Sequence, residues 1–106
     1  MTSLSTHVLD AVRGAPAAGV AVWLVRGEQR LTEALTDADG RVKELAAGLN
    51  PGDYRLFFDT GSYFAAQGTE TFYPEVCVAF TVGERQPHLH VPLLLSPFAY
   101  STYRGS

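Results

Sequence analysis

Short apolar runs separated by turn residues recur along the whole chain. Residues 20–26 (VAVWLVR) are apolar at alternate positions on both faces, a pattern typical of a strand that is buried on both sides. Similar β-rich runs follow toward the C-terminus. Besides 20–26, strands are predicted at residues 5–10, 30–36, 53–60, 75–82, 88–95 and 99–104.

The turn and helix signals between these runs are short. Asp39-Gly40, within TDADGR, is a strong signal for a tight turn. Residues 61–68 (GSYFAAQG) indicate a helix of about one or two turns, bracketed by glycines. Roughly seven or eight short strands and one short helix predict an all-β fold, an antiparallel β-sandwich. Function in such a fold comes from side chains on one face or one loop cluster.

Residues 88–95 (HLHVPLLL) combine an aliphatic face with a polar start. His88 and His90 are two residues apart and therefore project from the same face of the strand. Farther along the strand the same face becomes apolar, which is typical of the wall of a pocket. The alternative is that His88 and His90 are simply exposed to solvent at the edge of the sheet. The opposite face, predicted to be core, consists of Leu89, Val91, Leu93 and Leu95.

Length and composition narrow the function classes. The chain has room for one core, so residues 1–106 are expected to form a single domain, and 46% hydrophobic content excludes a disordered chain. A net charge of −3 with no run of Lys and Arg argues against a nucleic-acid partner. Cys77 is the only cysteine, and its apolar neighbours predict a buried, inert thiol in a reducing compartment.

No targeting or membrane segment is expected. The N-terminal residues lack a basic region followed by an apolar run, so no signal peptide is predicted. The apolar residues 91–100 are too short to cross a bilayer and contain prolines. We therefore expect a soluble, cytoplasmic protein without a membrane partner.

Two features of the sequence invite a metal-site interpretation. Three histidines, His7, His88 and His90, invite a zinc interpretation because catalytic zinc takes three protein ligands and an open position, but H-x-H alone permits such a site without favouring it. TDADGR resembles the start of a calcium loop. Gly48 stands at the twelfth position, where Glu is needed, and Gly40 at the fourth instead of the sixth, so the calcium interpretation fails.

The turn at Asp39-Gly40 delivers Arg41 onto the next strand. A guanidinium keeps its charge and offers a planar fork of donors, which suits an imide or a developing oxyanion, although an arginine at this position commonly faces solvent. A serine-hydrolase site on Ser96 is disfavoured because G-x-S-x-G is missing and Ser96-Pro97 indicates a turn. The residues alone thus predict a His/Arg site and name no substrate.

Five stretches, spread over essentially the whole chain, carry a family resemblance. In order they are LSTHVLD, TDADGR, GDYRLFFDTGSYF, FYPEV and HLHVPLLLSPFAYSTYRGS. Together they resemble the 5-hydroxyisourate hydrolases, the transthyretin-like enzymes of purine degradation. The departures are small: Leu89 stands where tyrosine is common, and SPFAY replaces the more usual SPYGY.

The resemblance implies a fold, an assembly and a reaction. The fold is a transthyretin-like antiparallel sandwich of two four-stranded sheets with one short helix. The assembly is a homotetramer, a dimer of dimers, with sites in the channel between the dimers. The reaction is hydrolysis of 5-hydroxyisourate to 2-oxo-4-hydroxy-4-carboxy-5-ureidoimidazoline in urate degradation, with no metal and no cofactor.

The resemblance also assigns residues. The family's catalytic side chains fall on His7, Arg41 and His90, and His88 is given a supporting role. The family's C-terminal tetrapeptide falls on residues 103–106 and is expected to help wall the site. Its substrate-binding residues are Tyr103, Arg104 and Ser106.

A mechanism follows as a hypothesis. His7 and His90 orient and deprotonate the water that attacks the C6 carbonyl, because an imidazole has an ordinary pKa of about 6.5. Neighbouring imidazoles and the guanidinium of Arg41 lower these pKa values, which keeps one histidine neutral. Arg41 holds the anionic substrate edge and the oxyanion. Tyr103 and Ser106 donate hydrogen bonds to the ring or the water.

A small-molecule carrier is the alternative function. Transthyretin resembles this chain in fold and in VLDAVRG (residues 8–14) and carries thyroid hormone in the equivalent channel. The vertebrate carrier lacks His7, Arg41, His90 and the YRGS end, all of which are present here. A sandwich with a purely structural role is the third interpretation.

Overall fold

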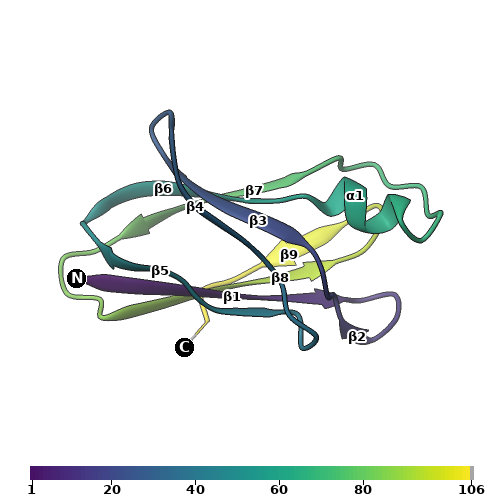
Figure 1. The fold of residues 1–106 in the computed structure, drawn as a ribbon, viewed down its shortest axis with the longest axis horizontal. Coiled ribbons are helices and arrows are strands. Elements are labelled where there is room, and N and C mark those ends of the chain that lie inside the picture. The colour runs from purple at the N-terminus through teal and green to yellow at the C-terminus, as the bar shows by residue number, and fades with distance from the viewer. Residues whose placement is uncertain (106) are drawn as a thin grey trace.

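Two β-sheets packed face to face make up residues 1–105, the part of the chain that the computed structural model describes (Figure 1). In the first sheet the strand order is β2-β1-β8-β9, and β5 pairs with β1 as well. All its pairs are antiparallel except β1 with β8, which run parallel. Its strands are β1 (Thr2–Asp10), β2 (Ala15–Pro16), β5 (Arg41–Leu49), β8 (His88–Leu95) and β9 (Tyr100–Thr102).

The second sheet is antiparallel, in the order β4-β3-β6-β7. The helix α1 (Thr60–Ala65) follows β6, and it begins where the Asp59 carboxylate accepts the N–H of Ser62 at 3.1 Å. The strands are β3 (Ala21–Arg26), β4 (Gln29–Leu35), β6 (Gly52–Phe58) and β7 (Val76–Val82).

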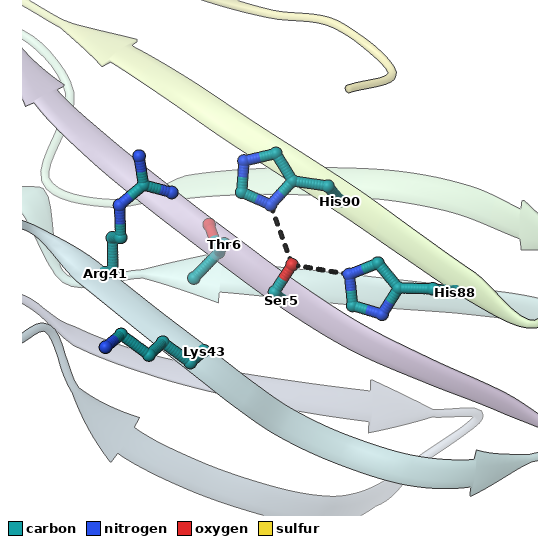
Figure 2. A pocket seen from close by; sticks show the side chains of 6 residues that line it. All are labelled: Ser5, Thr6, Arg41, Lys43, His88 and His90. Atoms are coloured by element: carbon teal, nitrogen blue, oxygen red, sulfur yellow. Dashed lines mark hydrogen bonds between the residues drawn. The ribbon is translucent and has the colours of Figure 1, made fainter. Parts of the chain in front are cut away.

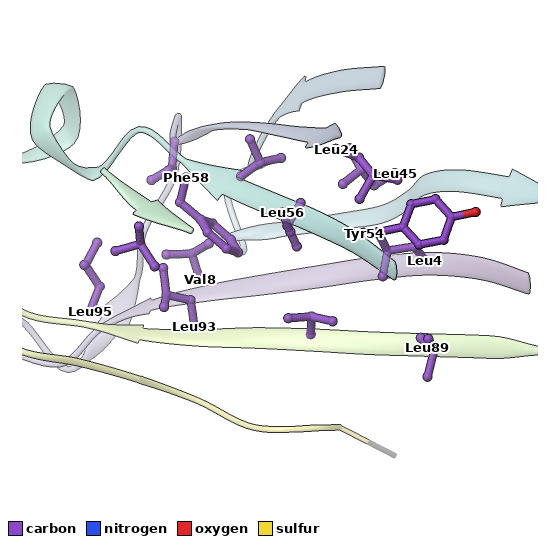
Figure 3. Close-up of a cluster of buried hydrophobic side chains, with 14 of the residues drawn as sticks. Leu4, Val8, Leu24, Leu45, Tyr54, Leu56, Phe58, Leu89, Leu93 and Leu95 are labelled. Atoms are coloured by element: carbon purple, nitrogen blue, oxygen red, sulfur yellow. The ribbon is translucent and has the colours of Figure 1, made fainter. Parts of the chain in front are cut away.

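The core fills the space between the sheets (Figure 3). The aliphatic face predicted for residues 88–95 is confirmed, since all four of its side chains are buried. They meet large apolar side chains from the opposite sheet, which removes the face from water and fixes the register of β8. The largest fully buried side chains include Phe58, Phe64, Leu4, Leu24, Leu56, Leu93 and Leu95.

The predicted fold class is confirmed, with two differences in detail. Every predicted strand and the short helix are present. The first sheet, however, has five strands within residues 1–105, because the two-residue β2 pairs with the end of β1 at Leu9 and Asp10. The parallel pairing of β1 with β8 was not predicted, since no local pattern records which distant strands become neighbours.

Two burial predictions are wrong. Residues 20–26 are not buried on both faces: Trp23 is half-buried on the outer side of β3, where it stacks on Phe57 with ring centroids 5.4 Å apart. Cys77 is exposed, because alternation along β7 turns Val76 inward and the thiol outward. In both cases the apolar run predicts burial on two sides, whereas a sandwich buries only the inner face of each sheet.

The single helix within residues 1–105 is far too short, and too little apolar, to cross a bilayer.

Candidate active site

The outer face of β1 gathers the polar side chains. Along β1, Ser3, Ser5 and His7 share one face because side chains alternate in a strand. On one side β8 places His88 beside Ser3 and His90 beside Ser5. On the other side β5 pairs Arg41 with His7. The parallel pairing of β1 with β8 thus joins residues more than eighty positions apart in the sequence.

The TDADGR turn holds Arg41 in place. The Asp37 carboxylate accepts the backbone N–H groups of Asp39 and Arg41, both at 2.9 Å, and the hydrogen bond from Arg41 lowers the pKa of this carboxyl group. Gly40 has a φ of 74°, and a Cβ there would lie 2.4 Å from the carbonyl oxygen of Val8. Only glycine lets the turn lie this close to β1.

A cavity of about 270 Å³ opens on this face (Figure 2). Two cations from β5, Arg41 and Lys43, stand on one side of it, and His90 stands on the other. Cations of this kind attract an anionic ligand. The lining residues are Ser5, Thr6, Arg41, Lys43, His88 and His90.

The ring of His90 is held by Ser5, and its backbone is held by Gly105. Its Nδ1 lies 2.7 Å from the Ser5 Oγ, and its carbonyl oxygen accepts the N–H of Gly105 at 2.8 Å. Burial lowers the pKa of His90, and the positive charge of Arg41, then His7 and His88, lowers it further. The predicted cause, neighbouring charge, is therefore present, but burial is the larger effect. A half-buried imidazole of this kind is neutral at pH 7 and able to accept a proton.

His7 lies at the margin of this arrangement. Its Nε2 is 2.9 Å from the carbonyl oxygen of Asp39, and a carbonyl only accepts, so Nε2 carries a proton and the neutral form of this ring has its lone pair on Nδ1. His7 is paired with Arg41 across the strands but does not line the cavity. The structure therefore brings Arg41 and His90 to one cavity, with His7 next to it.

The C-terminal residues fold back over His90. A Cβ on Gly105 would lie 2.6 Å from the His90 Cδ2, so this approach needs glycine. Tyr103 and Arg104 line a second cavity of about 320 Å³, and His90 lines both cavities. Tyr103 and Arg104 thus lie in a cavity that adjoins the first one at His90, and they do not line the first cavity. Ser106 lies outside the described residues.

The zinc interpretation gains no support. Within residues 1–105, no three or more His, Cys, Asp and Glu side chains are grouped so that they could hold a metal ion. The three histidines each use a ring nitrogen toward a serine or a carbonyl oxygen instead.

Ser3, Ser5 and Lys43 were missed as site residues. The signal for the serines was present, since S-x-S-x-H at residues 3–7 alternates as strictly as H-x-H at residues 88–90. Two strands that each carry such an alternating polar face indicate one shared polar surface. Lys43 follows Arg41 by two residues and shares its face for the same reason.

The fold and the site define a class: a β-sandwich with a small polar site, rich in histidine and arginine, on the outer face of one sheet. The model of the HIUase/Transthyretin family matches residues 4–105. The chain therefore belongs to the HIUase/Transthyretin family.

The chain is similar both to proteins named 5-hydroxyisourate hydrolase and to transthyretins. A 5-hydroxyisourate hydrolase of Caulobacter vibrioides is 49% identical, and the match covers 100% of each chain. The structure of Klebsiella pneumoniae 5-hydroxyisourate hydrolase has a TM-score of 0.93 and 41% identity, covering 100% of this chain and 94% of that one. Transthyretin from Sparus aurata has a TM-score of 0.91 and 34% identity, covering 96% and 95%.

Proposed function

We propose that this protein hydrolyses 5-hydroxyisourate to 2-oxo-4-hydroxy-4-carboxy-5-ureidoimidazoline in urate degradation. The observation that carries the proposal is the cavity in which Arg41 faces the neutral imidazole of His90. Relatives named 5-hydroxyisourate hydrolase, matched over their full or nearly full length, support the same substrate. The proposal covers residues 1–106 as one domain.

His90 is the general base of the proposed reaction. Hydrolysis requires that water lose a proton as it attacks the C6 carbonyl, and a neutral imidazole accepts that proton. Such assistance typically contributes about 10²–10⁴-fold to the rate. The imidazolium that results then protonates the ring nitrogen as the C–N bond breaks. The base is thereby regenerated, and no metal or cofactor takes part.

Arg41 stabilises negative charge in the same cavity. Its guanidinium stays charged and can hold two oxygens at once, so it suits the anionic edge of the substrate and the oxyanion of the tetrahedral intermediate. Lys43 adds a second positive charge on the same wall. Together the two cations draw an anionic substrate toward His90.

His7 and the C-terminal residues complete the proposed site. His7 offers its free Nδ1 to the attacking water, because Nε2 is engaged with Asp39. Tyr103, Arg104 and Ser106 bind the substrate ring. We place these residues at the dimer–dimer channel of a homotetramer, where one site is walled by more than one copy, in a cytoplasmic protein.

The test generates 5-hydroxyisourate from urate with urate oxidase and follows its ultraviolet decay with EDTA present. We expect the wild-type protein to accelerate the decay, and His7→Ala, Arg41→Ala and His90→Ala to lose most of this acceleration. Arg55→Ala is the control, since that arginine lies over Phe57 in the other sheet. Full activity in Arg41→Ala or His90→Ala would contradict the proposed roles.

A carrier is the second candidate, favoured by the likeness in fold to a transthyretin solved in complex with thyroxine. A carrier would bind thyroxine tightly and leave the decay of 5-hydroxyisourate unchanged. The two candidates are therefore separated by the same decay assay and a thyroxine titration.

A further inference from the structure

Two serines and His88 form an unbroken chain of polar contacts that ends on His90. The Ser3 Oγ lies 2.6 Å from the His88 Nδ1, and the Ser5 Oγ lies 2.8 Å from the His88 Nε2. The same Ser5 Oγ lies 2.7 Å from the His90 Nδ1. Figure 2 shows the Ser5 hydroxyl between the two rings. We call Ser3, His88 and Ser5 the positioning chain.

The proton positions in this chain depend on one another. Ser5 has one O–H, so it donates to one imidazole and accepts from the other. A neutral imidazole has one N–H and one lone pair, so the role of each nitrogen fixes that of the other. The chain therefore has two states. In one the His90 Nε2 is a lone pair, and in the other it is an N–H group.

The surroundings favour the state in which Nε2 is the lone pair. Figure 2 shows the second ring nitrogen of His90 on the side toward Arg41, whose guanidinium has only donors. A lone pair is attracted by that positive charge, whereas an N–H group is repelled. Lys43 adds a positive charge in the same cavity, and Arg104 shares the second cavity with His90.

The far end of the chain agrees with this choice. The carbonyl oxygen of Pro87 lies 3.4 Å from the Ser3 Oγ and can only accept. If Ser3 donates to this carbonyl oxygen, which also accepts the Ser3 N–H at 3.1 Å, its hydroxyl oxygen accepts from the His88 Nδ1–H. The His88 Nε2 is then a lone pair that accepts the Ser5 O–H, which leaves Ser5 to accept the His90 Nδ1–H. Each hydrogen bond in the series has one donor and one acceptor.

We propose that Ser5 and His88 are positioning residues that hold His90 as the Nδ1–H tautomer, with its Nε2 lone pair directed at the attacking water. The inference rests on the proposed function, because it gives His90 the role of base. Neither residue touches the reacting atoms. In their absence a larger share of His90 carries the proton on Nε2 and cannot act as a base.

His88→Ala is the sharpest variant, because His88 is exposed at the start of β8 and its removal leaves the core intact. The Ser5 hydroxyl then loses its acceptor and donates to the His90 Nδ1. We expect kcat to fall by about 10²-fold, within the usual range for general-base assistance, and KM to change by less than about threefold. His88→Gln restores an acceptor oxygen and should recover most of kcat. Arg85→Ala, an exposed change in the preceding loop, is the control.

A second readout does not depend on activity. The ¹⁵N chemical shifts of His90, measured where the ring is neutral, distinguish the Nδ1–H from the Nε2–H tautomer. Wild-type protein should show the Nδ1–H form, and His88→Ala and Ser5→Ala should both show a shift toward Nε2–H. An unchanged His90 tautomer in both variants, or an unchanged kcat in His88→Ala, would overturn the proposal.

The two measurements separate this inference from the proposed function. An active wild-type protein whose His88→Ala variant is equally active contradicts the positioning chain alone. If the wild-type protein does not accelerate the decay, but the Nδ1–H tautomer of His90 is lost in both variants, the proposed function is contradicted and the hydrogen-bond arrangement is supported.

Discussion

Replacing Gly105 with alanine tests how the C-terminal segment supports the site. The new Cβ would lie 2.6 Å from the His90 Cδ2 and 3.2 Å from its Cβ and Cγ. Carbon atoms are in ordinary contact at about 3.5–4.0 Å, so either the imidazole or the segment must move by about 1 Å. A misplacement of this size at a catalytic group costs about 10²-fold in rate, or roughly 2.7 kcal/mol.

The alternative response is that the segment moves away from β8. That breaks the hydrogen bond from the Gly105 N–H to the His90 carbonyl oxygen, which contributes about 1 kcal/mol net. We therefore expect Gly105→Ala to lower kcat/KM by about 5- to 100-fold in the decay assay. The free energy of unfolding, measured in urea, should fall by no more than about 1 kcal/mol, because the core is untouched.

Gly83→Ala is the matched control. The Cβ at this position meets only the Gln86 side chain, with its Oε1 at 3.2 Å, and displacing that side chain costs at most the hydrogen bond that Oε1 accepts from the Gly83 N–H. Wild-type kcat/KM in Gly105→Ala would refute the reasoning, since it would mean that contact with the C-terminal segment does not set the position of His90.

Four further predictions concern the same site. Arg41→Lys should lower kcat/KM by at least about tenfold in the decay assay, because an ammonium cannot reproduce the planar fork, and nearly full activity would contradict the role of Arg41. Since the pKa of His90 is lowered, kcat/KM should stay high until the pH falls below the ordinary imidazole value of about 6.5. The free energy of unfolding should fall as the pH decreases from that value toward the lowered pKa, because over this range the unfolded chain binds a proton that folded His90 does not. In Arg41→Gln the acidic limb of the residual activity should move to higher pH, and an unmoved limb would show that Arg41 does not act on this pKa. Gly40→Ala should reduce both activity and thermal stability, because its Cβ would press on the Val8 carbonyl oxygen and displace the turn that carries Arg41; an unchanged melting temperature would contradict this.

The strands could be predicted because their signals are local. A strand that is buried on one face has apolar residues at every second position, as in residues 88–95. The turn at Asp39-Gly40 is predictable because these residue types tolerate the backbone conformation of a tight turn. The same period placed His88 and His90 on one face. What a strand's own sequence does not encode is its neighbours. The parallel pairing of β1 with β8 brings Ser5 next to His90, and because this pairing could not be predicted from the sequence, the positioning chain could not be predicted either.

The errors have a related cause. An apolar run shows that a segment is a strand, but it does not show which face is inside. Cys77 and Trp23 lie on outer faces that are apolar without being core. The roles of Tyr103 and Arg104, carried over from the family resemblance, stay predictions, because they depend on side chains around a cavity that no periodicity defines.

The most direct test of the central claim is the decay rate of 5-hydroxyisourate with metal-stripped wild-type protein in EDTA, compared with the spontaneous rate in the same buffer. We predict an acceleration proportional to protein concentration that EDTA leaves unchanged and that His90→Ala abolishes. A decay rate equal to the spontaneous one, or an acceleration lost in EDTA and restored by added zinc, would contradict a metal-free hydrolase built on Arg41 and His90.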